Sequence, residues 1–344
     1  MFLSTSLRLL VNVESLNSVE SVGNVSRHRT VPIVVPGPDG YSIKYVPAVS
    51  GESIAHGYQS ELVDIAQRAG LPVGVYSSRK EFIKFSENDY LKDEGISPPK
   101  DYDDIRRFEV DVLLKDVVAD VGGFMYIPVK RTGDIPVKRT SRFQVGYMLP
   151  ALEDVTKAAA LEAQFHVRFL FSKQQKGGEG AALGQIPYNI EAASALYTLT
   201  FNLDIAGIAV PSTTFGKKSE ASEKQLAAQA PKRRLSALKA LGSLLSNLSF
   251  GAKHSRYLPN SELMSCILTV SSIPFTVSPG NTRAYIAQTS RRMKQLSSIV
   301  GGEVKAWAVA KEELEKPSDV IYLETVEEII GSVIDVLRGK GMAE

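Results

Sequence analysis

The sequence predicts an α+β fold of the ferredoxin-like, split βαβ type, in which two helices cover an antiparallel sheet that carries large insertions. Apolar and polar residues alternate over 7–13, 162–171 and 192–203, which is the period of strands. Over 50–68 and 232–248 the apolar residues instead recur at helical spacing. The predicted elements follow one another in the order strand, helix, strand, strand, helix, strand. This order is that of the split βαβ fold.

The first strand is predicted over 7–13, where four apolar residues alternate with polar ones. A polar loop is expected over 15–30. A hairpin follows over 31–46, because two extended runs flank the turn-forming sequence Pro-Gly-Pro-Asp-Gly. Ser50 is a suitable N-cap for the first helix, which should end at Arg68.

The second half of the predicted fold follows a charged, helical insertion over 79–120 that is interrupted by glycine and prolines. Strands at 162–171 and 192–203 are joined by a segment rich in glycine, glutamine and lysine, so we expect a hairpin with a long tip. An amphipathic helix over 232–248 and a strand over 263–270 complete the pattern.

Four regions are expected from this order of elements. The core is discontinuous and comprises residues 1–70 and 120–275. A helical lobe, 71–119, is inserted into it, and 173–187 form the tip of the hairpin. Residues 276–344 are expected to add a C-terminal α/β unit, with helices over 282–298 and 325–338 and a strand over 304–309.

Composition narrows the class of protein. The 344 residues are 44% hydrophobic, enough for a substantial core. The single cysteine, Cys266, lies in an apolar run and cannot form an internal disulfide or a cysteine zinc site. No apolar run reaches the roughly 18 residues of a membrane helix, and the N-terminus lacks the features of a signal peptide. We therefore expect a cytoplasmic protein without a membrane partner.

Charge is segregated along the chain although the net charge is only +2. Residues 87–120 contain eleven acidic and five basic residues, whereas 126–142 contain five basic residues and one acidic residue. A basic loop cluster beside an acidic segment suits a groove that binds a polyanion. A solvated loop without a partner is the alternative.

Five ordered blocks resemble the CRISPR-associated autoregulator (DevR) family of the RAMP superfamily. They are Ser-Val-Gly-Asn-Val-Ser-Arg-His-Arg-Thr at 21–30, Val-Ser-Gly-Glu-Ser-Ile-Ala-His-Gly-Tyr-Gln at 49–59, Asp-Val-Gly-Gly-Phe at 120–124, Lys-Arg-Thr-Ser-Arg-Phe-Gln-Val-Gly-Tyr at 138–147 and Gln-Phe-His-Val-Arg-Phe at 164–169. The resemblance is closest to the archaeal subtype I-A backbone subunit.

The resemblance implies a modified RNA-recognition fold and a non-catalytic role without cofactor or metal. Many copies would line up head to tail along one guide RNA (crRNA) as the backbone of a Cascade interference complex. The implied partners are this RNA, target DNA paired through it, other Cascade subunits and further copies of the chain. A "thumb" hairpin that reaches over the guide in this family matches residues 173–187.

The first group of candidate RNA-binding residues lies in the loop after the first strand and in the first helix. Guanidinium groups pair bidentately with phosphates, although a solvated basic loop is the alternative. The free N–H groups beside Ser50 could hold a phosphate, although capping alone explains a serine there. A metal site around Glu52 lacks a third ligand nearby in sequence. The group comprises Asn24, Arg27, His28, Arg29, Ser50, His56 and Gln59.

The second group lies in basic segments farther along the chain. Two of its members alternate with phenylalanines on the strand 162–171, on the face where an RNA-recognition fold presents bases. Others form a glycine-containing basic loop that suits a phosphate. The group comprises Lys138, Arg139, Arg142, His166, Arg168, Lys253 and Arg256.

Two other functions remain open from the sequence. Some proteins of this general fold are metal-independent ribonucleases that process CRISPR RNA with histidine as acid and base. The four histidines, His28, His56, His166 and His254, fall in separate segments, so their pairing in space is undecided. A DNA-binding regulator is less favoured, because no helix-turn-helix pattern with basic recognition residues stands out.

Overall fold

The structure is a computed structural model that describes residues 1–128, 135–171 and 183–344. Its strands are β1 (Phe2–Glu14), β2 (Ser18–Val22), β3 (Val25–His28), β4 (Thr30–Gly37), β5 (Gly40–Pro47), β6 (Phe124–Tyr126), β7 (Val137–Arg139), β8 (Phe143–Val145), β9 (Leu149–Pro150), β10 (Ala159–Phe171), β11 (Leu183–Asp204), β12 (Asn260–Ser271), β13 (Val304–Ala310) and β14 (Ile321–Tyr322). Its helices are α1 (Gly51–Arg68), α2 (Val75–Ser78), α3 (Asn88–Asp93), α4 (Ile105–Lys115), α5 (Val117–Gly122), α6 (Glu220–Ala228), α7 (Ala230–Asn247), α8 (Tyr285–Val300) and α9 (Val326–Gly339), with a 3-10 turn at Tyr102–Asp104.

A mixed sheet organises most of these elements, in the order β14-β13-β12-β1-β11-β3-β2. The central strand β1 is antiparallel to both β11 and β12, since Phe2 is opposite Asp204 on one side and Ser271 on the other. Strands β8, β9 and β10 pair one after another along β11, each antiparallel to it. The chain is therefore an α+β protein, as the sequence predicts.

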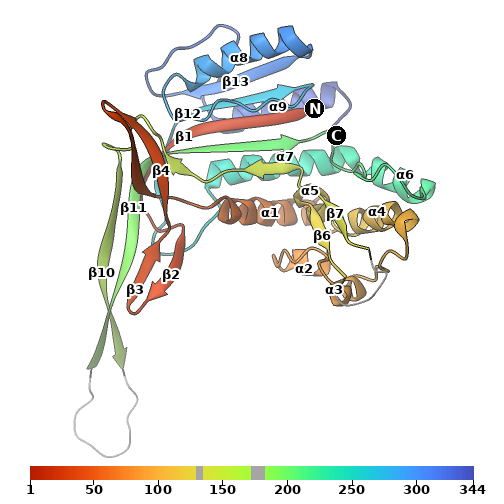
Figure 1. The fold of residues 1–344 in the computed structure, drawn as a ribbon, viewed down its shortest axis with the longest axis horizontal. Helices are drawn as coiled ribbons and strands as arrows, with labels where there is room; N and C mark the ends of the chain where they lie inside the picture. The colour runs from red at the N-terminus through yellow and green to blue at the C-terminus, as the bar shows by residue number, and fades with distance from the viewer. Residues whose placement is uncertain (129–134, 172–182) are drawn as a thin grey trace, which may run out of the picture.

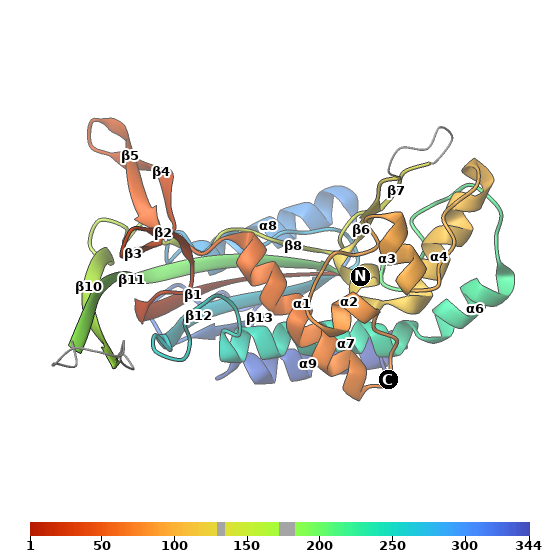
Figure 2. The ribbon, with the colours of Figure 1, turned by 90° about the horizontal axis from the view of Figure 1, so that it is seen from below.

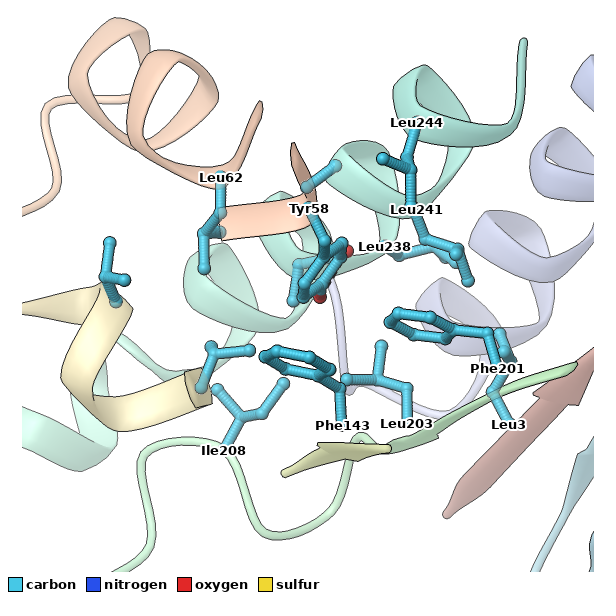
Figure 3. Close-up of a cluster of buried hydrophobic side chains, with 14 of the residues drawn as sticks. Leu3, Tyr58, Leu62, Phe143, Phe201, Leu203, Ile208, Leu238, Leu241 and Leu244 are labelled. Carbon is cyan, nitrogen blue, oxygen red and sulfur yellow. Dashed lines mark hydrogen bonds between the residues drawn. The ribbon is translucent and has the colours of Figure 1, made fainter. Parts of the chain in front are cut away.

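The main core lies between the sheet and the helices α1, α7 and α9, which share one face of it (Figure 1). Tyr58 of α1 is fully buried and donates a hydrogen bond to the carbonyl oxygen of Ala237, at 3.0 Å. Its ring meets those of Phe143 and Phe201 at centroid distances of 4.8 and 4.9 Å (Figure 3). Burial of each such aromatic side chain contributes about 1.5–3 kcal/mol to folding.

The opposite face of the sheet is covered at β1 by the protein's own chain. Arg8 is fully buried and pairs with Asp154 and Glu312 at 2.9 and 2.8 Å. The hydroxyls of Ser4 and Ser6 accept hydrogen bonds from backbone N–H groups of residues 277 and 280. Part of the predicted C-terminal unit, including α8, thus completes this side of the sheet, whereas α9 belongs to the main core.

The segment 15–30 is not the loop that the sequence predicts. It contains the hairpin β2–β3, whose turn includes Gly23 at φ 61°, and β3 pairs with β11 in parallel. Positive φ is a conformation that glycine adopts at little cost. The polar composition of this hairpin conceals it, because β2 and β3 have few buried positions.

The hairpin β10–β11 is longer than predicted and extends away from the body of the protein (Figure 1). We call its paired segments, 159–171 and 183–195, the arm; the register runs from Ala159 opposite Ala195 to Phe171 opposite Leu183. Of the predicted tip, 173–187, residues 173–182 lie outside the described part, and the others belong to β11.

The predicted helical lobe contains α2, α3 and α4, and it lies at the end of the body away from the arm, as Figures 1 and 2 both show. None of the helices within 1–128, 135–171 and 183–344 combines the length and apolar character that a membrane span requires.

Candidate nucleic-acid interface

A cleft of about 370 Å³, which we call the arm cleft, opens beside the arm. It brings together residues from β3, β10, β11 and the loop 251–259. Cross-strand pairing of His166 with Tyr188 and of Arg168 with Ile186 places these four side chains on one face of the arm. The lining residues are Ser26, Arg168, Tyr188, Ile190, Lys253, Ser255, Arg256 and Tyr257.

Tyr188 is the centre of a packed group in the cleft. The His166 ring stacks on it, with a centroid distance of 5.2 Å and an angle of 21°. The Arg168 guanidinium lies 5.7 Å from the Tyr188 ring centroid, and the Arg256 Nη1 donates to the tyrosine hydroxyl at 3.4 Å. The His166 Nε2 lies 2.5 Å from the hydroxyl of Tyr257. These contacts hold two tyrosines among cationic side chains.

The arm cleft is electropositive. Within the part of the chain that the structure describes, Arg168, Lys253 and Arg256 form no salt bridge with a carboxylate. Partial burial, together with the charge of Arg256, lowers the pKa of Lys253 from its ordinary value. Burial and the neighbouring Tyr188 raise the pKa of Tyr257, so its hydroxyl stays neutral at physiological pH. Cations beside aromatic rings suit the phosphates and bases of a single-stranded nucleic acid.

Four residues predicted from the sequence meet at this cleft: His166, Arg168, Lys253 and Arg256. Asn24 lies in the β2–β3 turn nearby, and its Nδ2 donates to the carbonyl of Pro187 at 3.3 Å. Arg27 is also exposed there and faces Glu191 at 3.7 Å. That these residues contact RNA stays a prediction.

Sequence reasoning missed the two tyrosines of the cleft, Tyr188 and Tyr257. Tyr188 carried no signal in the sequence, because the predicted strand begins at residue 192, whereas in the structure Tyr188 stands directly opposite His166. Tyr257 follows Arg256 in the basic loop, so that its position next to a predicted contact was a usable signal.

His28 needs correction as a surface contact, because it is only 3% exposed. Its Nε2 lies 2.8 Å from Glu14 Oε1, and its Nδ1 lies 2.9 Å from the carbonyl of Arg29. Burial alone would lower the pKa of His28, but the hydrogen bond and charge of Glu14 outweigh it and raise the pKa. Arg29 is half-buried, and its backbone N–H and C=O bond to Asn17 and Ala48.

Two of the three predicted contacts at α1 also lie in the interior. Ser50 is 4% exposed and caps the helix, since its Oγ accepts from the N–H of Ser53 at 3.3 Å. Gln59 is 5% exposed and donates to the carbonyl of Ala55 at 3.0 Å. Only His56 is exposed, packed edge-on against Phe82. The predicted contacts at α1 are therefore divided between surface and core.

The largest correction concerns Arg139, which is 3% exposed. Its guanidinium pairs with Glu109 at 2.8 Å and Asp120 at 2.6 Å, and Asp120 also pairs with Arg233 at 2.9 Å. This buried network joins α4, α5, β7 and α7, so the structure gives Arg139 a structural role.

Neighbouring basic residues are also remote from the arm cleft. Arg142 is largely buried and pairs with Asp204 at 3.2 Å. Lys138 is exposed on β7, at the end of the body away from the arm (Figures 1 and 2). The predicted basic cluster is thus split between an interior network and a distant surface.

Comparison with known protein families gives a match to the model of the CRISPR-associated negative auto-regulator DevR/Csa2 over residues 5–290. The CRISPR-associated aCascade subunit Cas7/Csa2 2 of Saccharolobus solfataricus is 50% identical over 329 residues, which are 95% of this chain and 98% of the relative. The CRISPR-associated protein Cas7/Csa2 1 of the same organism is 38% identical and covers 83% of this chain and 85% of the relative.

Solved structures with a similar fold come from CRISPR complexes. A chain of a CRISPR RNA-guided surveillance complex in a pre-nicking state has a TM-score of 0.53 and 12% identity, covering 98% of this chain and 100% of that one. Another chain of a CRISPR RNA-guided surveillance complex has a TM-score of 0.50 and 10% identity, covering 98% and 99%. At such low identity, the likeness shows a shared fold alone.

Proposed function

Because the chain belongs to the CRISPR-associated DevR/Csa2 family, we propose that it is a non-catalytic backbone subunit that binds the guide RNA of a Cascade complex. A relative with 50% identity is an aCascade subunit, and chains of similar fold belong to RNA-guided surveillance complexes. The observation that carries the proposal is the arm cleft, in which three cations surround two tyrosines and have no carboxylate partner among the described residues.

The strand order supports a modified RNA-recognition fold for this role. Strands β12, β1 and β11, followed by the broken strand β8–β9–β10, are antiparallel neighbours, and α1 and α7 cover one face. This is the order of the split βαβ arrangement. The second face is covered at β1, so the proposed path of the RNA follows the arm cleft and avoids the middle of the sheet.

The chemistry of the cleft favours RNA binding that does not depend on sequence. Guanidinium and ammonium groups bind phosphates, and the tyrosine rings can stack on any base. Contacts to backbone and ring faces leave the hydrogen-bonding edges of most bases free for pairing with target DNA. Repetition of the cleft on head-to-tail copies would extend the grip along the guide.

A comparison of two unrelated RNAs of equal length tests this proposal. Fluorescence anisotropy should give dissociation constants that agree within about threefold, because the proposed contacts carry no sequence information. A preference of roughly a hundredfold or more for one sequence would contradict the proposed mode of binding.

A ribonuclease is the second candidate, because His166 and Tyr257 form a close pair beside Lys253. Such groups can move protons during attack of a ribose 2′-hydroxyl. End-labelled RNA should remain intact on the wild-type protein if the chain is a backbone subunit. Shortening of the RNA that disappears in both His166→Ala and Tyr257→Phe would favour the enzyme instead.

A further inference from the structure

A groove of about 580 Å³, which we call the helix groove, lies in the seam between the packed helices α1 and α7. On α7 its lining residues stand at positions 232, 235, 236, 239 and 243, a spacing that puts them on one side of the helix. This stripe is about 16 Å long. The C-terminal end of α1 forms the other wall, so the groove follows the line where the two helices meet.

The floor of the helix groove is aliphatic. Ile65, Ala69 and Leu235 are half-buried, and each packs against the main core as well as lining the groove. The described residues that line it include no aromatic ring. A partner that covers these side chains would remove apolar surface from water, which favours binding.

The rim of the helix groove is basic. Arg68 and Lys239 are exposed, and Lys232 is half-buried. Over the described ranges of the chain, none of these three cations forms a salt bridge with a carboxylate. The Arg68 Nε instead donates to the backbone carbonyl oxygen of Asp64 at 3.1 Å. The groove therefore presents three positive charges that are available to a partner.

Lys232 stands where a cation is disfavoured on its own helix. Helix α7 begins at Ala230, and its first turn contains no acidic residue. The N-terminal end of a helix is positive, so a cation in the first turn is repelled. Arg233 is stabilised there by Asp120 at 2.9 Å, but Lys232 has no such carboxylate in the described structure. An acidic group from outside the chain would relieve this repulsion.

Charged and aliphatic side chains alternate along the helix groove in an order that a second helix can match. Lys232 and Lys239 lie about two turns apart on α7, and Leu235 lies between them. A helix with acidic residues at the same spacing and aliphatic residues between them presents the complementary order. A nucleic-acid strand carries a charge on every nucleotide and would bring phosphates over the aliphatic floor, so it fits less well.

We propose that the helix groove docks an acidic amphipathic helix of a partner protein, a contact that goes beyond the proposed binding of RNA. Two carboxylates of the partner would pair with Lys232 and Lys239, and its aliphatic side chains would cover Leu235 and Ile65. The helix groove and the arm cleft share no lining residue, so both sites can be occupied at once.

The chain supplies an acidic residue of its own to this site. Glu344 lines the helix groove, and Figures 1 and 2 both show the point marked C close to α7. Glu344 has the same charge as the proposed partner, so it opposes docking electrostatically. Its neutralisation should therefore strengthen binding, an effect opposite in sign to the removal of a lysine from the rim.

A titration with a synthetic peptide tests the proposal. The labelled probe is a short helical peptide with leucines along one face and glutamates beside them, spaced like the two lysines of the groove. Fluorescence anisotropy should show saturable binding with a dissociation constant on the order of 1–100 μM, as expected for a small interface. The same peptide with glutamines in place of the glutamates should bind at least about tenfold more weakly. Absence of saturable binding, or equal binding of both peptides, would overturn the proposal.

Charge reversal identifies the groove as the docking site. Lys232→Glu with Lys239→Glu should weaken binding of the acidic peptide at least about thirtyfold, because like charges then face each other. A peptide with lysines in place of the glutamates should bind this double variant more tightly than wild type, which also shows that the variant is folded. Lys224→Glu with Lys311→Glu is the matched control, since both lysines are exposed and lie outside the groove. An equal loss of binding in the control would refute docking at the groove.

Two milder variants and an RNA titration complete the test. Glu344→Gln should tighten binding of the acidic peptide about two- to fivefold, and Lys239→Gln should weaken it about three- to tenfold. The reverse change in either variant would contradict the proposal.

The affinity of the Lys232→Glu, Lys239→Glu variant for RNA should stay within about twofold of wild type, because the arm cleft is a separate site. A loss of RNA binding as large as the loss of peptide binding would show that the groove takes nucleic acid and would refute the proposal. If the wild-type chain binds no RNA, the proposed function fails, whereas the peptide titration contains no RNA and still decides whether the groove docks an acidic helix.

Discussion

Replacement of Arg256 by alanine should weaken RNA binding without unfolding the protein. The side chain is exposed and donates a long hydrogen bond, at 3.4 Å, to the hydroxyl of Tyr188. Its loss should change the free energy of unfolding by less than about 0.5 kcal/mol, as for most surface substitutions. A charge-assisted bond to phosphate is worth roughly 1.5–3 kcal/mol, so affinity should fall about ten- to hundredfold.

The salt dependence of binding identifies the lost contact. For single strands the logarithm of the binding constant falls with the logarithm of salt concentration by about 0.7 for each neutralised phosphate. Anisotropy titrations of Arg256→Ala at several salt concentrations should therefore give a slope that is shallower by about 0.7 for two unrelated RNAs alike.

Arg291→Ala is the matched control. It removes the same charge from α8, where the side chain is 65% exposed and faces Glu315. This variant should bind RNA like the wild type. An equal loss of affinity in both variants, or a loss in Arg256→Ala confined to one RNA sequence, would refute the reasoning.

Three further changes test other parts of the structure. Arg139→Ala leaves buried carboxylates without a cation, so urea unfolding should show a loss of about 3–5 kcal/mol, against less than about 0.5 for Lys138→Ala. The pKa of His28 is raised in the folded protein. The stability advantage of wild type over His28→Gln should therefore be fully present below pH 6.5 and decline as pH rises through the folded-state pKa. Thermal unfolding of both proteins at several pH values measures this difference in stability. Tyr188→Ser should weaken RNA binding about five- to hundredfold and Tyr188→Phe much less, since a stacked base needs only the ring.

Elements with strong local signals are predictable from this sequence. Helix α1 ends at Arg68 as expected, and its N-cap is the predicted Ser50, because capping chemistry and apolar spacing are both local. The strands β1 and β12 are likewise predictable from the spacing of their apolar residues. The hairpin β2–β3 was missed because its polar strands have few buried positions, and its pairing with β11 links residues far apart in sequence.

The candidate site was harder to predict, because burial depends on distant partners. Arg139 and Arg256 look alike in sequence, since both lie in short basic segments. Arg139 is interior because Glu109 and Asp120 come from other elements to meet it. Arg256 finds no such carboxylate among the residues that the structure describes. Charge patterns therefore locate basic segments without separating structural arginines from available ones.

Photo-cross-linking of RNA that contains 4-thiouridine tests most directly whether the arm cleft binds the guide. Mass spectrometry of the digested adduct should find RNA on peptides that contain Tyr188 or Tyr257, and adduct formation should decrease as salt concentration rises. Adducts confined to other regions, such as the exposed surface around Lys138, would show that RNA binds elsewhere and would contradict the account.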